Sequence, residues 1–285
     1  MGQPQAQRRT RLDPVLRTIL FVADASPRSQ RAVTYGTELA QAAGAGLVVV
    51  RPGRPSNRVH LLGSSHPKRD RDPATALLAE IERRRPDLVV MATRRPRLLG
   101  RWLDGDVEEA VVRGECPVLL VPPGRPTPAQ LHGQRILLPL DGTALSEAAL
   151  PTATLLARTL ESELVLLRAV EPVSARSYLR HVSELDAALS VVDSEEKARG
   201  YVERLACRLS LREDGLSVTS VVRIGALIPL VHELTSANPP TITPAGLVVL
   251  AAHARRTLAG TRLGSVADAI LRESDIPLVV VPPPI

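Results

Sequence analysis

The residues best suited to chemistry lie in one stretch near the end of the chain, between Leu247 and Ser265. The apolar run Leu247-Val-Val-Leu250 predicts a buried parallel strand, and the periodic apolar residues from Val266 onward predict a helix. Ligands of open α/β sheets bind in the loop after such a strand. The free N–H groups at a helix start favour anions. This stretch therefore predicts an anion-binding site that opens at Gly264-Ser265.

Common catalytic and metal-binding motifs are absent from the sequence. It contains no Gly-x4-Gly-Lys-Ser/Thr loop, no Gly-x-Ser-x-Gly elbow and no His-Glu-x2-His pair. The six histidines are scattered without metal-ligand spacing. Cys116 and Cys207 each lie in an apolar segment, which is more typical of buried thiols than of a disulfide. We therefore expect neither enzymatic activity nor a bound metal.

The charge and composition indicate which classes of partner the protein can bind. The formal net charge is +6 and comes almost entirely from arginine, which attracts anions. Aromatic residues make up only 2% of the chain, so there is no stacking platform for nucleic acid, and no nucleic-acid-binding motif occurs. No apolar run reaches the length of a membrane span, and the polar start lacks a secretory signal. We expect a soluble, cytoplasmic protein with no membrane partner. Nucleic acid is disfavoured as a partner, and binding of anions or nucleic acid through the arginines, with an affinity that falls steeply with salt, stays open as a third class of function.

One arginine cluster has two interpretations. Arg94, Arg95, Arg97 and Arg101 lie close together in the sequence, beside Trp102. They form either a solvated loop in which Trp102 fills a gap, or a contact for an anion or a protein partner. The sequence leaves the role of this cluster open.

The chain is an internal repeat of one α/β unit. Four apolar blocks occur twice in the same order, for example Ile19-Leu-Phe-Val-Ala-Asp24 and Ile136-Leu-Leu-Pro-Leu-Asp141. Short runs rich in Val, Leu and Ile alternate with longer amphipathic segments, which predicts parallel sheets with helical crossovers. We expect strands near 18–23, 46–51, 58–62, 87–92 and 117–121, and again near 135–140, 163–168, 217–223, 246–251 and 277–281. We expect helices near 28–43, 73–85, 105–114, 145–160, 176–212, 226–235 and 265–273.

The anion-binding stretch also resembles the nucleotide loop of universal stress proteins. Their usual pattern after the fourth strand is Gly-x2-Gly-x9-Gly-Ser/Thr, and here it reads Ala251-x2-Ala254-x9-Gly264-Ser265. With the repeated strand order, the chain resembles a tandem, two-domain member of this family over about residues 15–283. The resemblance implies two Rossmann-like domains, each a five-stranded parallel sheet with flanking helices, paired through their last strands as an internal pseudo-dimer. The alternative is that each last strand is covered by its own linker.

This resemblance divides the chain into four parts. A disordered basic N-terminus covers residues 1–14, the first domain 15–123, a proline-rich linker 124–133, and the second domain 134–285. The segment 176–212 corresponds to the second helix of the family fold and has no equivalent in the first copy. The first domain is therefore expected to be degenerate and to lack that helix.

The resemblance also implies that ATP or another adenine nucleotide binds the second domain only. Asp141 would meet the base, the backbone at Ala169 would face adenine, and Ser265 would cap the helix and donate to phosphate. The complete predicted site is Asp141, Ala169, Ala251, Ala254, Arg255, Gly264, Ser265 and Val266. The two alanines add a Cβ where the family has glycine, and the neighbouring arginines could partly compensate by charge.

The first copy is expected to have lost nucleotide binding. Its loop reads Ala92-Thr-Arg-Arg95, and the expected Gly-Ser pair is Gly105-Asp106. A carboxylate at the helix start would accept the N–H groups that a phosphate uses, and would repel the phosphate. The implied function is a non-enzymatic stress-response protein that senses an adenine nucleotide. The alternative is a nucleotide-free scaffold that binds a protein partner through the first domain. Either form could assemble further as a homodimer of chains.

Overall fold

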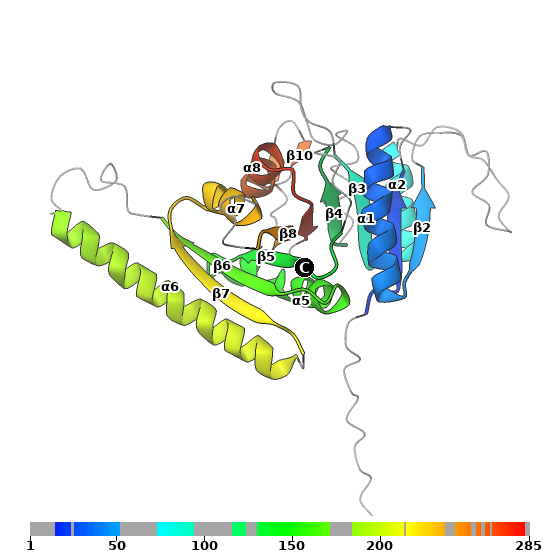
Figure 1. Ribbon diagram of the computed structural model, residues 1–285. Helices are drawn as coiled ribbons and strands as arrows, with labels where there is room; N and C mark the ends of the chain where they lie inside the picture. Colours follow the sequence, from blue (N-terminus) through cyan, green and yellow to red (C-terminus); the bar gives the residue numbers. More distant parts are fainter. Residues whose placement is uncertain are drawn as a thin grey trace, which may run out of the picture.

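One continuous nine-stranded sheet runs through both halves of the chain, with helices on its two faces (Figure 1). The structure, a computed structural model, describes residues 15–23, 26–51, 73–93, 116–123, 130–171, 184–213, 215–236, 243–251, 255–257, 260–262 and 264–282. The predicted strand 58–62, the predicted helix 105–114, the N-terminal segment 1–14 and the arginine cluster lie outside these residues, as does most of the predicted linker.

The first half contributes four parallel strands to the sheet within the described residues. They are β1 (Thr18–Val22), β2 (Gly46–Val50), β3 (Leu88–Ala92) and β4 (Val118–Val121), in the spatial order β2-β1-β3-β4. Two helices, α1 (Pro27–Ala43) and α2 (Pro73–Arg84), join them. Pro27 suits the first turn of α1, and Gly44 ends that helix in the left-handed conformation, with φ of 62°. These six elements confirm the predicted α/β order.

The second half contributes five parallel strands, as predicted. They are β5 (Arg135–Pro139), β6 (Leu164–Val170), β7 (Val218–Ile224), β8 (Ala245–Ala251) and β11 (Leu278–Val281). Their spatial order is β11-β8-β5-β6-β7, so the strand order reverses direction at β5. That reversal separates the two crossovers that leave β5 and β8, and in open α/β sheets ligands bind outside the carboxyl ends of the strands at such a point.

Five helices accompany these strands in the described part of the second half. They are α4 (Ala144–Glu147), α5 (Leu150–Thr159), α6 (Glu184–Arg212), α7 (Leu227–Thr235) and α8 (Ser265–Glu273). The single helix predicted for 145–160 is interrupted, because Pro151 has no N–H to donate to the carbonyl of Glu147. Residues 52–72 are outside the described part, so the loss of the second helix in the first domain remains a prediction.

Two apolar cores lie on the two faces of the sheet. On one face the strands bury side chains against α1, α5 and α6, including Leu39, Leu156 and Leu205. On the other face they bury side chains against α2, α7 and α8, including Leu77 and Ile270. Because both halves contribute to each core, the halves form one packed body.

The two halves join through their last strands. β4 and β11 pair antiparallel, with Leu119 opposite Val279 and Leu120 opposite Leu278. The carboxylate of Glu38 in α1 accepts hydrogen bonds from the backbone N–H groups of Leu131, and of His132 at 2.9 Å, at the entry to the second half. This arrangement confirms the predicted internal pseudo-dimer in place of strands covered by their own linkers.

Candidate functional site

The predicted site residues gather at the carboxyl ends of three neighbouring strands. β5 lies between β8 and β6 and is parallel to both. Asp141 lies two residues after the end of β5, Ala169 is the last residue but one of β6, and Ala251 is the last residue of β8. The short helix α4 after β5 contacts β8 and so closes the turn over this edge. The structure therefore places these three residues along one edge, where the strand order reverses.

Asp141 is held in position by the turn that follows it. Its Oδ1 accepts hydrogen bonds from the Thr143 N–H at 2.9 Å and from the Thr143 hydroxyl at 2.6 Å. The Thr143 hydroxyl oxygen in turn accepts from the N–H of Ser146 and caps α4. Gly142 between them has φ of 84°, a conformation that favours glycine. The Asp-Gly-Thr sequence thus fixes the carboxylate at the edge formed by the carboxyl ends of the strands.

The carboxylate of Asp141 is charged at neutral pH. Burial raises its pKa, but the hydrogen bonds from Thr143 and Ser146 and the positive charge of Arg168 outweigh burial, so the pKa lies below its usual value. The Asp141 side chain is nevertheless exposed to solvent. It can therefore accept a hydrogen bond from a ligand such as an amino group or a hydroxyl.

A second group of polar residues lies beside Asp141, and we did not predict it. Arg168 donates to the carbonyl of Leu140 at 3.3 Å, and the Tyr201 hydroxyl in α6 donates to Glu147 at 2.8 Å. Burial and the Glu147 carboxylate raise the pKa of Tyr201, which stays protonated. A signal for Arg168 was present in the repeat, since in both copies the predicted second strand ends with arginine, Arg51 and Arg168. The link between α4 and α6 depends on tertiary packing and left no sequence signal.

The helix start expected to bind an anion is built differently from our prediction. The N-cap of α8 is Gly264, with φ of −58° and ψ of 154°, and its carbonyl accepts from the N–H of Asp268 at 3.0 Å. Ser265 is the first helical residue and is exposed, so the prediction that it caps the helix is wrong. Gly264 has no side chain that could cap this end of α8, so within the described residues the N-cap itself leaves the first N–H groups of the helix to other partners.

The direction of α8 places this start at the same edge of the sheet. The C-terminal end of α8 leads through four residues to the start of β11, so its N-terminus points toward the carboxyl ends of the strands. The first turn also contains Asp268, whose carboxylate is paired with Arg272 by contacts of 2.9 and 3.1 Å. This pairing offsets the negative charge that would otherwise repel a phosphate.

The stretch between β8 and α8 is only partly described. We predicted a loop there, but it contains a short antiparallel hairpin of β9 (Arg255–Thr257) and β10 (Gly260–Arg262). Arg255 begins β9, Val266 lies in the first turn of α8, and Ala254 is outside the described residues. Asp24 and Asp106 of the first copy are outside them as well.

The two thiols have different surroundings. Cys116 is buried and lies 3.0 Å from the carbonyl oxygen of Pro86, and burial together with the nearby Asp87 raises its pKa to about 12. Cys207 is exposed, so the prediction that it is buried is wrong. The buried residues of α6 include Ala198, Val202, Leu205 and Ala206, and the helical period turns Cys207 to the solvent side. Across the described ranges, no group of His, Cys, Asp and Glu could hold a metal ion, and no helix is long and apolar enough to cross a membrane.

Several solved structures align with nearly the whole length of this chain. A protein of unknown function from Pseudomonas aeruginosa PAO1 is 15% identical with a TM-score of 0.59, over 94% of this chain and 93% of that one. A universal stress protein from Archaeoglobus fulgidus DSM 4304 is 14% identical with a TM-score of 0.56, over 93% and 98%. A putative universal stress protein from Pseudomonas aeruginosa UCBPP-PA14 is 15% identical with a TM-score of 0.57, over 94% of both chains. At this identity the likeness establishes the shared fold.

The fold and the edge described above define a tandem Rossmann-like α/β protein whose two halves share one sheet. No curated protein matches the chain significantly. The sequence profile of the universal stress protein family matches residues 60–122 and 133–282, which is more than half of the chain. The chain therefore belongs to the universal stress protein family.

Proposed function

We propose that this protein is a non-enzymatic stress-response protein that senses ATP or another adenine nucleotide through its second half. One observation carries the proposal. A charged, exposed Asp141 is fixed at the same sheet edge as the first N–H groups of α8, to which the N-cap Gly264 offers no side chain. The first group can accept a hydrogen bond from a base or sugar, and the second can bind phosphate oxygens.

Ala251, which replaces the first of the family's two glycines, is less of an obstacle than its sequence position suggests. Among the described residues, the only non-glycine residues with positive φ are Arg85 and Glu161. Ala251 therefore adopts a backbone conformation that alanine tolerates, and it pairs regularly with Val281 of β11. Its Cβ costs space near the ligand but no backbone strain. We therefore expect a site with reduced affinity that is still functional.

The direct test is calorimetric titration of ATP into the parent protein and into Ser265→Asp. The new carboxylate would accept the free N–H groups of α8 and repel the phosphates. We expect one site per chain in the parent and binding at least about tenfold weaker in the variant, because a phosphate loses its charge-assisted hydrogen bonds.

Ser210→Asp is the matched control for this experiment. Ser210 is exposed on α6, on the opposite face of the sheet, so the same chemical change there should leave ATP affinity at the parental value. A stoichiometry near two would show that the first half also binds. Equal affinity in the parent and Ser265→Asp would remove α8 from the site.

The alternative function, a nucleotide-free scaffold, has one structural feature in its favour. β2 is the outermost described strand of the first half, and Val49 on it is 41% exposed. An exposed edge strand can pair with a segment of another protein. Two results together would favour the scaffold function. The parent would show no heat of binding with ATP at millimolar concentration, and the purified chain would retain a protein partner that the Val49→Lys variant does not retain.

A further inference from the structure

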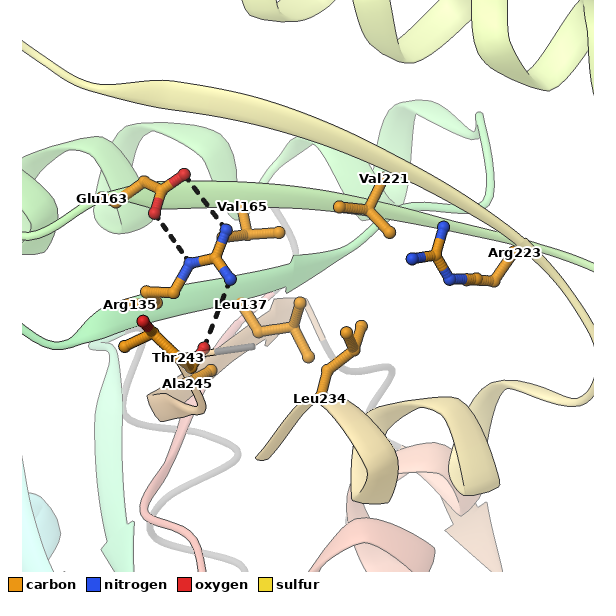
Figure 2. Close-up of a pocket in the computed structure, with 9 residues that line it drawn as sticks. All are labelled: Arg135, Leu137, Glu163, Val165, Val221, Arg223, Leu234, Thr243 and Ala245. Atoms are coloured by element: carbon orange, nitrogen blue, oxygen red, sulfur yellow. Dashed lines mark hydrogen bonds and ion pairs between the residues drawn. The ribbon is translucent and has the colours of Figure 1, made fainter. Parts of the chain in front are cut away.

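A cavity of about 460 Å³ lies over β5, β6 and β7, on the sheet face that carries α7 and α8 (Figure 2). Its size falls in the range of small-molecule pockets, which is about 300 to 1,000 Å³. α7 packs on β8 and α8, which leaves the outer part of this face open. Leu137, Val165 and Val221 form the floor, and Leu234 at the end of α7 forms one wall. The walls are aliphatic, without an aromatic ring among the lining residues.

One end of the cavity is closed by a neutral ion pair. Glu163 accepts two hydrogen bonds from the guanidinium of Arg135, at 2.7 and 3.2 Å, and a third from the Thr219 hydroxyl at 2.7 Å. Arg135 also donates to the carbonyl of Thr243 at 3.2 Å. The charges of Arg135 and Glu163 therefore cancel, and most of their hydrogen-bonding groups are used. This end has little attraction for an anion.

The other end carries a positive charge that no carboxylate neutralises. Arg223 in β7 is exposed and forms no ion pair with an acidic residue of the described chain. Its one hydrogen bond, at 3.0 Å, goes to the carbonyl of Val222. In Figure 2 the two guanidinium groups lie at opposite ends of the row of aliphatic side chains. The cavity is therefore polar at both ends, aliphatic between them, and positively charged at one end only.

We propose that this cavity binds a monoanionic aliphatic amphiphile, a medium-chain carboxylate. Its carboxylate pairs with Arg223, and its chain lies along Val221 and Val165 toward Glu163. A second anionic group at the far end would meet the carboxylate of Glu163, which excludes dicarboxylates. Aliphatic walls offer no stacking surface, which disfavours aromatic acids. The bound carboxylate supplies a charge partner that Arg223 lacks among the described residues.

This site is separate from the proposed nucleotide site. Arg135, Glu163 and Ala245 lie at the amino ends of their strands, whereas Asp141 and Ala251 lie at the carboxyl ends. The two sites approach each other only at Arg223, whose register partner on β6 is Ala169. An experiment on the cavity must therefore also measure competition with ATP.

The test is calorimetric titration of octanoate into the full chain and into Arg223→Gln. We expect one octanoate per chain and about tenfold weaker binding in Arg223→Gln, because a charge-assisted hydrogen bond to the carboxylate is lost. Arg212→Gln changes an exposed arginine of α6 on the opposite face and should bind as the parent does. Neutral 1-octanol and the dianion octanedioate should both bind more weakly than octanoate.

Several results would overturn the proposal. They are parental affinity in Arg223→Gln, equal binding of octanol and octanoate, or no binding of octanoate by the parent at millimolar concentration. Competitive displacement of octanoate by ATP would assign Arg223 to the nucleotide site instead. Octanoate binding that persists in saturating ATP, and in Ser265→Asp, supports a separate site even if the nucleotide proposal fails.

Discussion

The seam between β4 and β11 makes a quantitative prediction about stability. Leu119 is 0% exposed and lies opposite Val279 across the seam. Leu119→Ala deletes three carbon atoms, whose transfer from water is worth about 0.8 kcal/mol per methylene. The cavity left behind adds to that cost, and the combined loss for buried leucines is about 2 to 5 kcal/mol. Because neighbours on both strands are wholly buried and cannot easily collapse into the gap, we expect a loss near 4 kcal/mol.

Urea unfolding followed by circular dichroism measures this loss, with Leu211→Ala as the matched control. Leu211 is 79% exposed at the end of α6, so the same deletion there should change the free energy of unfolding by less than about 0.5 kcal/mol. A loss below about 1 kcal/mol in Leu119→Ala would refute the buried seam. Equal effects of the two substitutions would refute it as well.

A double-mutant cycle separates the seam from general core packing. Leu119→Ala and Val279→Ala remove side chains that face each other, so their effects should be non-additive by about 1 kcal/mol. Val202 in α6 is also buried but covers β6 and β7, at least four strands from β4 or about 20 Å. Leu119→Ala and Val202→Ala should therefore add within about 0.5 kcal/mol. Additivity across the seam would show that β4 and β11 do not pack as paired strands in solution.

Three further predictions follow from local features. Cys207 should react with a disulfide reagent in the native protein, whereas Cys116 should react only on unfolding. Cys207→Ser should therefore leave no fast-reacting thiol. Two fast-reacting thiols in the parent would contradict the burial of Cys116. Burial raises the pKa of Glu163, but the hydrogen bonds from Arg135 and Thr219 outweigh burial and hold the pKa below 4.5. The ionised carboxylate therefore contributes its full stability above pH 4.5, and this contribution is lost as the pH falls through the pKa of Glu163 in the folded state. Thermal melts should therefore show Glu163→Gln less stable than the parent at neutral pH, with the gap narrowing in acid, and a constant gap would contradict this. Gly246 lies at a bulge, where an added Cβ would come within 2.8 Å of the Gln134 Cβ. Gly246→Ala should therefore lower the free energy of unfolding by about 1 to 3 kcal/mol. An unchanged urea midpoint would contradict this crowding.

The fold could be predicted from the sequence because its signals are local and repeated. Buried strands such as Leu247–Leu250 are short, continuous apolar runs, and four such runs occur twice in the same order. The antiparallel seam followed from the two apolar last strands together with the family resemblance. The break between α4 and α5 could also have been predicted from Pro151. The effect of this proline depends, however, on where the first helix begins.

The site could be predicted only in part, because its geometry depends on contacts between distant residues. Asp141 and the start of α8 were found from strand ends and the Gly-Ser pair. The contact of Tyr201 with Glu147 joins residues 54 positions apart and needs the packing of α6. The same limit applies to Arg223, which became notable only when the sheet placed it at one end of a cavity. Cys207 was misplaced because its neighbours are apolar, whereas its exposure depends on the face of the helix.

The reversed strand direction at the seam determines which molecules can be held at the same time. β4 runs opposite to β11, so the carboxyl ends of the first four strands and those of the last five open on opposite margins of the sheet. A nucleotide near Asp141 and a protein docked at the corresponding margin of the first half would be out of each other's reach. They would not compete for space, and any signal between them would have to travel through the shared strands.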